Sequence, residues 1–398
     1  MDLLPVETAL ERVLEGTVPS KPESVTITDA GGRVLAEPVV SRRMQPSFDA
    51  SAMDGYAFRS TNASVGARLR LVGEAAAGRR FERVLQGGEA IRIFTGAPLP
   101  SGADTVLPQE EANVEGGSLV IGAISQGGQH VRLAGCDFGI GEPLLAPGRR
   151  IGARELAVIA SANLDVISVR HKPIVAILSI GDELVQPGPT LGPDQTIATN
   201  AFAIGEMARN AGADVSDLGI VSDKVGNVTA AATTAASFAD VLVTIGGASV
   251  GDHDVARPGL AAAGMELDFW RIAMRPGKPL VFGRLGEMAV LGLPGNPVSS
   301  FVCGVIFLRP LVTAMLGTSA ASDETPAVLG AELPANGPRT HYLRASVIDN
   351  PHGLPRVVPL PQQDSSLLGV LARADCLLIH PGNADRSEAG SICSIIRL

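Results

Sequence analysis

Residues 174–179, Ile-Val-Ala-Ile-Leu-Ser, form an unbroken apolar run that leads into Gly181-Asp182-Glu183. A strand with no polar alternation is typical of a parallel sheet that is covered on both faces. We expect three further strands of this kind at 214–221, 241–245 and 288–293. Helices separate them at 201–212 (with Asn200 as its cap), at 225–238 and from 297 to 315. Strands that alternate with helices predict a parallel α/β domain, which we place at 172–318.

The segments around this domain have a different pattern. Residues 45–142 are glycine-rich with short alternating runs, which predicts an inserted β-rich subdomain. Residues 1–44 and 143–171 predict a linker subdomain with helices at 2–15 and 153–163 and a hairpin at 24–40. Residues 327–398 predict a small C-terminal β-domain. The expected fold class is therefore multidomain, α/β plus β.

The composition restricts the class of protein. The chain has 398 residues, with 32 Lys and Arg against 41 Asp and Glu, a net charge of −9. An acidic chain is a poor electrostatic match for nucleic acid or an anionic membrane. Apolar stretches such as 301–308 are shorter than the roughly 20 residues of a membrane span. The first residues show no export signal, and the 4 cysteines form no Cys-x-x-Cys pair, so we expect a cytoplasmic protein with reduced thiols.

Acidic residues follow three of the expected strands. Asp182 and Glu183 follow the first, Asp223 follows the second, and Asp252 and Asp254 follow the third. Ligands of parallel α/β sheets bind at the carboxyl ends of the strands, so these carboxylates should share one edge. Crowded carboxylates repel unless a cation lies among them, and oxygen ligands suit Mg²⁺. The alternative is a set of solvated loop acids and helix caps.

A cationic segment and a glycine loop complete the candidate site. Arg275 and Lys278 are separated by Pro and Gly, which makes a stiff anion clamp. Gly246, Gly247 and Gly251 allow backbone N–H groups to approach an anion. The combination predicts a phosphorylated ligand with a divalent metal. The alternative for the clamp is a β-turn with two surface cations.

The sequence lacks the Rossmann, P-loop and His-Glu-x-x-His motifs. Ser249 lies in a Gly-x-Ser-x-Gly match, for which Asp268 and either His341 or His380 could complete a serine-hydrolase triad. A nucleophile elbow should lead directly into a helix, whereas an acidic loop follows here. In that loop, His253 is either a ligand or a surface residue.

The N-terminal β-rich segment concentrates further polar groups. Asp54 lies in an otherwise apolar stretch, and Thr95, Arg132 and Asp137 add a hydroxyl, a cation and an acid. Spacing alone gives no way to bring them to the edge of the α/β sheet. Assembly of two chains could do so.

Six ordered blocks carry a resemblance to a known family. They are PSFDASAMDGYA (46–57), RIFTGAPLPSGADTVLPQEE (92–111), ILSIGDEL (177–184), TIGGASVGDHD (244–254), RPGKPLVFG (275–283) and LPGNPVSSFV (293–302). The chain resembles the molybdopterin molybdenumtransferases of the MoeA type and is similar to the E domain of gephyrin. The resemblance covers nearly the whole chain.

The resemblance implies an activity and an assembly. Such enzymes insert molybdate into adenylylated molybdopterin with Mg²⁺, release AMP and yield molybdenum cofactor. They form elongated homodimers, in which the site lies between the α/β domain of one chain and a β-domain of the other. Asp54, Thr95, Arg132 and Asp137 would then reach the partner's site. Other proteins that handle molybdenum cofactor are possible partners.

The resemblance also implies roles for single residues. Asp182, Glu183, Asp223 and Asp254 would hold Mg²⁺ or the phosphates, and Ser249, Arg275, Lys278, Arg344 and Ser365 would bind molybdate. The chain departs from the family at Arg275, where Lys is usual, at Thr199-Asn200, where Asp-Ser-Asn is usual, and at Asp364-Ser365, where Gly-Ser is usual. An adenylyltransferase of the same pathway and a non-catalytic scaffold remain as alternatives.

Overall fold

The computed structural model describes residues 3–62, 64–123, 126–188, 190–247, 255–318, 323–348, 350 and 353–398. The chain divides into two compact units. Unit 1 comprises Met1–Glu23, Gly32–Ala36 and Val169–Leu398, and unit 2 comprises Ser24–Gly31 and Glu37–Ser168.

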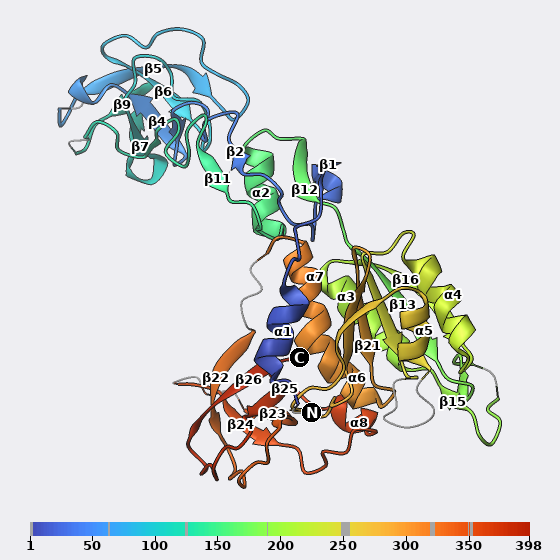
Figure 1. Cartoon of the computed structure of the whole chain (residues 1–398). Coiled ribbons are helices and arrows are strands. Elements are labelled where there is room, and N and C mark those ends of the chain that lie inside the picture. The colour runs from blue at the N-terminus through green and yellow to red at the C-terminus, as the bar shows by residue number, and fades with distance from the viewer. Residues whose placement is uncertain are drawn as a thin grey trace. The chain divides into compact units, whose positions relative to one another are not determined.

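A six-stranded sheet organises the middle of unit 1 (Figure 1). Its order is β16 (Asp214–Val221), β13 (Ile174–Ile180), β17 (Val241–Ile245), β21 (Met288–Leu293), β20 (Val281–Leu285) and β18 (Glu266–Phe269). The first four strands are parallel, and β20 and β18 are antiparallel to their neighbours. Every residue of β17 and β21 is buried, as expected of strands without polar alternation.

Helices cover both faces of this sheet. Alternate strand residues enter two separate cores, so that Val243 packs on one side and Leu242 on the other. The first core includes side chains of α3 (Asn200–Ala211) and of the helix that begins at Pro297, and the second includes side chains of α4 (Val225–Ala235) and α5 (Ala256–Ala262). The α/β prediction is confirmed.

The longest helical segment runs from Pro297 to Met315 as α6 (Pro297–Cys303), a π-helical turn (Gly304–Leu308) and α7 (Arg309–Met315). Its 19 residues and mean hydropathy of 1.8 are enough to cross a membrane by length and composition. The segment is 67% buried inside the protein, however, and its side chains belong to the first core. It is accordingly a core helix.

A second sheet in unit 1 contains the C-terminal residues. Its order is β19 (Met274–Arg275), β23 (Thr340–Ile348), β24 (Arg356–Pro359), β22 (Glu324–Leu329), β26 (Ile392–Arg397) and β25 (Cys376–His380), and β23 also pairs with β25. The short helix α8 (Leu368–Leu371) precedes β25. Because Arg275 is the last residue of β19, the candidate clamp begins at this sheet.

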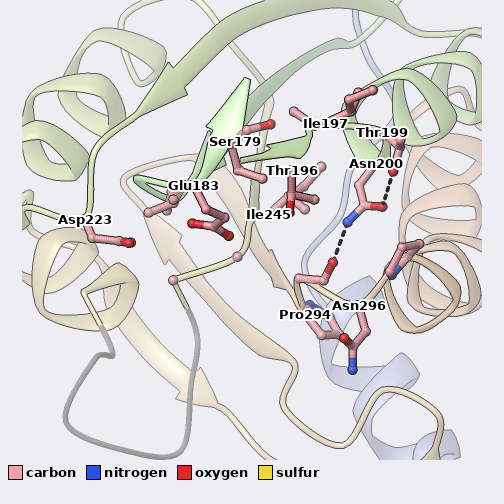
Figure 2. A pocket seen from close by; sticks show the side chains of 18 of the residues that line it. Ser179, Glu183, Thr196, Ile197, Thr199, Asn200, Asp223, Ile245, Pro294 and Asn296 are labelled. Atoms are coloured by element: carbon pink, nitrogen blue, oxygen red, sulfur yellow. Dashed lines mark hydrogen bonds between the residues drawn. The ribbon is translucent and has the colours of Figure 1, made fainter. Parts of the chain in front are cut away.

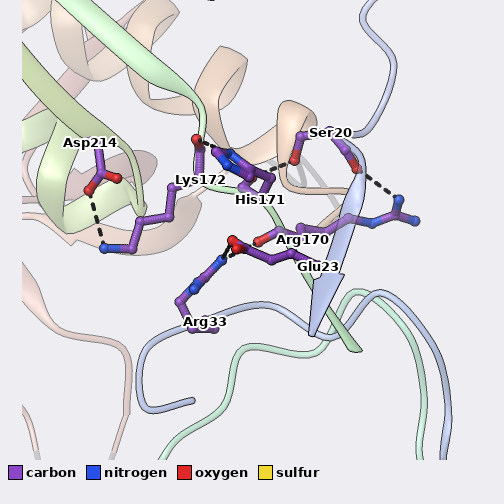
Figure 3. A network of polar contacts seen from close by, with 7 residues as sticks. All are labelled: Ser20, Glu23, Arg33, Arg170, His171, Lys172 and Asp214. Carbon is purple, nitrogen blue, oxygen red and sulfur yellow. Dashed lines mark hydrogen bonds and ion pairs between the residues drawn. The ribbon is translucent and has the colours of Figure 1, made fainter. Parts of the chain in front are cut away.

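The N-terminal helix and a polar network complete unit 1. Helix α1 (Val6–Leu14) buries Val6, Ala9 and Val13 in the first core. Figure 3 shows Arg33 bound to Glu23 and, at 2.7 Å, to the carbonyl oxygen of Arg170. Arg170 in turn donates to the carbonyl oxygen of Ser20 at 3.0 Å. These contacts hold three segments of the chain together.

Unit 2 is mainly β-structure. Its principal sheet has the order β7 (Thr105–Pro108), β4 (Gly55–Phe58), β6 (Glu89–Ile93), β5 (Arg68–Ala75), β9 (Ser118–Val120) and β8 (Asn113–Glu115). Helix α2 covers Ala153–Ser161. Strand β3 (Ala50–Ser51) pairs with β10 (Val131–Arg132) in unit 2, and in unit 1 β14 (Leu184–Val185) pairs with β15 (Thr196–Ile197).

The hairpin expected over 24–40 is wrong. Strand β1 (Pro22–Thr26) pairs with β12 (Val166–Arg170), and β2 (Val39–Val40) pairs with β11 (Pro143–Leu145). A 3₁₀ turn at Ile27–Asp29 lies between β1 and β2. Alternation along a strand shows that it pairs, but it does not show with which strand.

Candidate active site

A pocket of about 540 Å³ lies at the carboxyl ends of β13, β17 and β21 (Figure 2). Figure 2 shows Glu183 and Asp223 at one side of the pocket and Asn200 and Asn296 at the other. Loops that follow successive parallel strands supply these residues, as the general rule for α/β sheets requires.

The acidic loops after β13 and β16 lie against each other. The backbone N–H of Asp182 donates to Oδ2 of Asp223, and the backbone N–H of Asp223 donates to Oδ1 of Asp182, each at 3.3 Å. Glu183 and Asp223 both line the pocket. The structure therefore brings Asp182, Glu183 and Asp223 to one edge of the sheet.

These carboxylates suit a hard cation by donor type, because oxygen is the preferred ligand of Mg²⁺. Within the described part of the chain, no three His, Cys, Asp or Glu side chains gather closely enough to hold a metal by themselves. Ser249, Gly251, Asp252, His253 and Asp254 lie outside the described residues. The fit of the site to Mg²⁺ thus rests on the chemistry of Glu183 and Asp223 at the pocket wall.

The turn after β17 requires glycine. Gly246 has φ of +85°, and a Cβ at this position would lie 2.5 Å from the carbonyl oxygen of Ile180. Gly247 has φ of +66° and lies against the side chain of the same isoleucine. Both glycines line the pocket, so the turn lets the backbone form part of its wall.

The cationic segment packs beside the pocket. Gly277 has φ of +108°, and a Cβ there would lie 2.5 Å from Sγ of Cys303 in α6. Arg275 and Lys278, on either side of this turn, are exposed. Pro279, the next residue, lines the pocket. The clamp is therefore held by close backbone packing while its two charges remain free to meet an anion.

Arg344 is a buried cation with free donors. Its side chain is 0% exposed, and Nη2 donates to the carbonyl oxygens of Asp364 at 3.1 Å and Gln362 at 3.4 Å. Nε and Nη1 have no hydrogen-bond partner. Burial lowers the pKa of Arg344, and the nearby positive charge of Arg275 lowers it further. A buried guanidinium with unpaired N–H groups favours an anion at this position.

Two asparagines belong to the site although the sequence analysis did not place them there. Asn200 donates through Nδ2 to the carbonyl oxygen of Gly295 at 2.7 Å, and Asn296 donates to Oγ of Ser365 at 3.2 Å. The prediction that Asn200 caps α3 is wrong, because Thr199 holds the N-cap position and makes no side-chain capping bond. The signal for Asn296 was its place in the loop after the fourth parallel strand.

Of the four candidate site residues in unit 2, Asp54 and Thr95 are hydrogen-bonded to each other. The backbone N–H and the hydroxyl of Thr95 both donate to Oδ1 of Asp54 at 2.8 Å, and they hold the pKa of Asp54 below its usual range. Arg132 lies in β10, and the backbone N–H of Asp137 donates to the carbonyl oxygen of Gln45 at 2.9 Å. Among the described residues, no hydrogen bond or ion pair joins Arg132 or Asp137 to Asp54.

The described residues do not support the serine-hydrolase hypothesis, because they do not bring a triad together. Asp268 forms an ion pair with Arg12 at 2.9 Å on the edge strand β18. His341 and His380 lie opposite each other in β23 and β25, and neither Nε2 has a partner. The acid and the candidate bases thus lie in different sheets, and Ser249 is outside the described part of the chain.

Comparison with known proteins identifies the class. Family models match the MoeA N-terminal region (domain I and II) at residues 4–163, a probable molybdopterin binding domain at 176–314, and the MoeA C-terminal region (domain IV) at 326–398. The fold and these three matches define a multidomain protein of molybdenum cofactor biosynthesis, in which the α/β domain carries the pocket.

Relatives specify the family. The chain is 31% identical over 397 residues to a molybdopterin molybdenumtransferase of Haemophilus influenzae, covering 99% of this chain and 98% of the relative. It is 30% identical over 403 residues to that of Bacillus subtilis, covering 99% and 94%. A MoeA protein structure from Pyrococcus horikosii matches with a TM-score of 0.85 at 28% identity, covering 100% of this chain and 99% of that one. The chain belongs to the molybdopterin molybdenumtransferase family, which confirms the resemblance.

Proposed function

We propose that this molybdotransferase inserts molybdate into adenylylated molybdopterin and releases AMP in a reaction that depends on Mg²⁺. The observation that carries the proposal is Arg344, a fully buried guanidinium whose Nε and Nη1 have no hydrogen-bond partner. Its anchoring segment contains Ser365, which is hydrogen-bonded to Asn296 at the pocket wall. A tetrahedral oxyanion accepts hydrogen bonds from donors of this kind.

The cationic and hydroxyl side chains would bind one substrate, and the pocket backbone would bind the other. Arg344, Ser365, Arg275 and Lys278 would bind molybdate, with Ser249 added by the resemblance. The Gly246-Gly247 turn of the pocket would hold the pterin and its phosphates. Separation of AMP from the pterin phosphate leaves negative charge on both fragments, and cationic or N–H donors fixed in advance lower its energy.

The acidic edge would supply the metal site. Asp182, Glu183 and Asp223 would hold Mg²⁺, together with Asp254 by resemblance, and the bound ion would neutralise charge on the pyrophosphate. Glu183 and Asp223 support this assignment because they face the pocket.

We further propose that the enzyme is a cytoplasmic homodimer. In that assembly Asp54, Thr95, Arg132 and Asp137 of one chain complete the site of the other. The paired Asp54 and Thr95 support this, because two hydrogen bonds fix them as a polar group in unit 2.

The test is AMP release from purified protein and adenylylated molybdopterin. We expect AMP only when molybdate and Mg²⁺ are both present. Asp223→Ala should lower turnover by about a hundredfold, the usual loss when a group that orients a metal or a charged transition state is removed. Asp214→Ala is the matched control, because Asp214 lies at the other end of β16 and its side chain forms an exposed ion pair with Lys172.

Other results would favour the alternatives. Consumption of ATP without AMP release that depends on molybdate would indicate an adenylyltransferase. Binding of the pterin without any product would indicate a scaffold.

A further inference from the structure

Asn296 stands at the N-terminal boundary of α6 without capping it. Its backbone is extended, with φ of −62° and ψ of 127°, and its side chain makes no capping bond. Asparagine at this position ordinarily accepts a hydrogen bond from a backbone N–H in the first turn. Local rules of this kind are most often broken at functional sites, so an amide that does not cap its helix needs another explanation.

Ser365 performs the capping instead. The backbone N–H of Val298, in the first turn of α6, donates to the carbonyl oxygen of Ser365 at 3.0 Å. The side chain of Asn296 makes a second, separate bond to Ser365, from Nδ2 to Oγ at 3.2 Å. The first bond satisfies the N–H of Val298 in the first turn without using the Asn296 side chain. The second is therefore free to serve the pocket, which Asn296 lines.

The bond from Asn296 determines what the Ser365 hydroxyl can do. A serine hydroxyl has one proton to donate and two lone pairs to accept with. Because Asn296 donates to Oγ, the serine proton remains available, and the described part of the chain offers it no acceptor. One residue earlier, the carbonyl oxygen of Asp364 holds Nη2 of Arg344 at 3.1 Å. The free hydroxyl and the free guanidinium donors are thus presented by one short segment.

We propose that Asn296 is a positioning residue that directs the Ser365 hydroxyl proton to the bound oxyanion and fixes the Arg344 segment to the pocket. The inference rests on the proposed function, because it takes the oxyanion to be molybdate held by Ser365 and Arg344. Asn296 acts through Ser365 and does not touch the reacting atoms. It therefore governs the affinity for molybdate rather than that for the pterin.

The test measures AMP release while molybdate and the pterin substrate are varied separately. Asn296→Ala should raise KM for molybdate about tenfold, the effect of losing one well-directed bond to a charged ligand, and leave KM for the pterin within about twofold. Asn296→Asp should raise KM for molybdate about a hundredfold, since a carboxylate turns the serine proton towards itself and repels the anion.

Two further variants separate positioning from folding. Asn296→Ser can cap α6 but is too short to reach Ser365, so it should be stable and show the same rise in KM as Asn296→Ala. Ser366→Ala is the matched control, because Ser366 donates to Oδ1 of Asp364 at 2.6 Å and not to Asn296, and its KM for molybdate should not change.

A double-mutant cycle with Ser365→Ala tests whether Asn296 affects molybdate binding through Ser365. If Asn296 acts through Ser365, Asn296→Ala adds nothing in the Ser365→Ala background. Full additivity, or an equal rise in both KM values, would overturn the inference. Wild-type protein that releases no AMP would instead contradict the proposed function. Calorimetric titration of molybdate into each variant then gives the same comparison without turnover, so the two failures are distinguishable.

Discussion

Burial disfavours the charged form of two histidines in the C-terminal sheet. His341 in β23 faces His380 in β25, and the Nε2 atoms of both rings are buried without a partner. Burial lowers the pKa of His341 to about 4, and the charges of Arg275, Arg344 and Arg339 act in the same direction. Burial also lowers the pKa of His380. The folded protein therefore keeps both rings neutral under conditions in which the unfolded chain protonates them.

This difference predicts acid sensitivity with a definite sign. Above the ordinary pKa of histidine, about 6.5, neither state binds the proton, so His341 has no effect on stability. Between about pH 6.5 and pH 4, His341 is protonated in the unfolded chain but not in the folded protein, so the free energy of unfolding falls as the pH falls. Below about 4 both states are protonated and the loss is constant. Urea titrations from pH 7.5 to 4.5 should show a smaller loss for His341→Gln than for wild type. Equal losses would contradict the assignment.

At the scale of elements, the helix from Pro297 to Met315 depends on tertiary packing. Leu311 is 0% exposed in the first core, so Leu311→Ala should lower the free energy of unfolding by about 2–5 kcal/mol through lost burial and the cavity left behind. Thr313→Ala removes only the bond from its hydroxyl to the carbonyl oxygen of Arg309, an ordinary helix contact, and should cost less than about 1 kcal/mol. Denaturant unfolding of the two variants compares them. A Leu311→Ala protein as stable as wild type would show that the helix is not part of the core.

The same elements show how far sequence reasoning reaches. Strands β16, β17 and β21 have the predicted bounds. For β17 and β21 this is because a short apolar run that is buried throughout leaves little choice of structure. The expected hairpin at 24–40 failed because its two strands pair with residues more than a hundred positions away, which no local pattern encodes.

Some residues of the candidate site could likewise be predicted from the sequence, and others could not. The rule that ligands bind at the carboxyl ends of parallel strands predicted that Asp182 and Asp223 lie close together. In the structure each accepts a hydrogen bond from the backbone N–H of the other. The role of Asn296 was out of reach, because it depends on contact with Ser365, 69 positions later in the chain. The general preference of asparagine for helix caps gave a wrong prediction for Asn200. Its side-chain amide donates to the carbonyl oxygen of Gly295 and does not cap α3.

At the scale of the whole molecule, the proposed shared site makes a prediction about mixed dimers. Asp223 belongs to unit 1 and Asp54 to unit 2, so in a homodimer with shared sites each variant should damage a different half of every site. Asp223→Asn and Asp54→Asn homodimers should each be nearly inactive. A heterodimer that carries one variant per chain has one site with both defects and one intact site, and it should recover about half of the wild-type activity.

Tandem affinity purification of differently tagged chains isolates that heterodimer for the AMP assay. The control pairs Asp54→Asn with Thr95→Ala, because both residues belong to unit 2 and leave every shared site with one defect. This second heterodimer should stay as inactive as its parents. Recovery in both pairs, or in neither, would contradict the shared site, and a monomer in light scattering would exclude it. Recovery in the first pair alone requires that each pocket draws its unit 2 residues from the other chain.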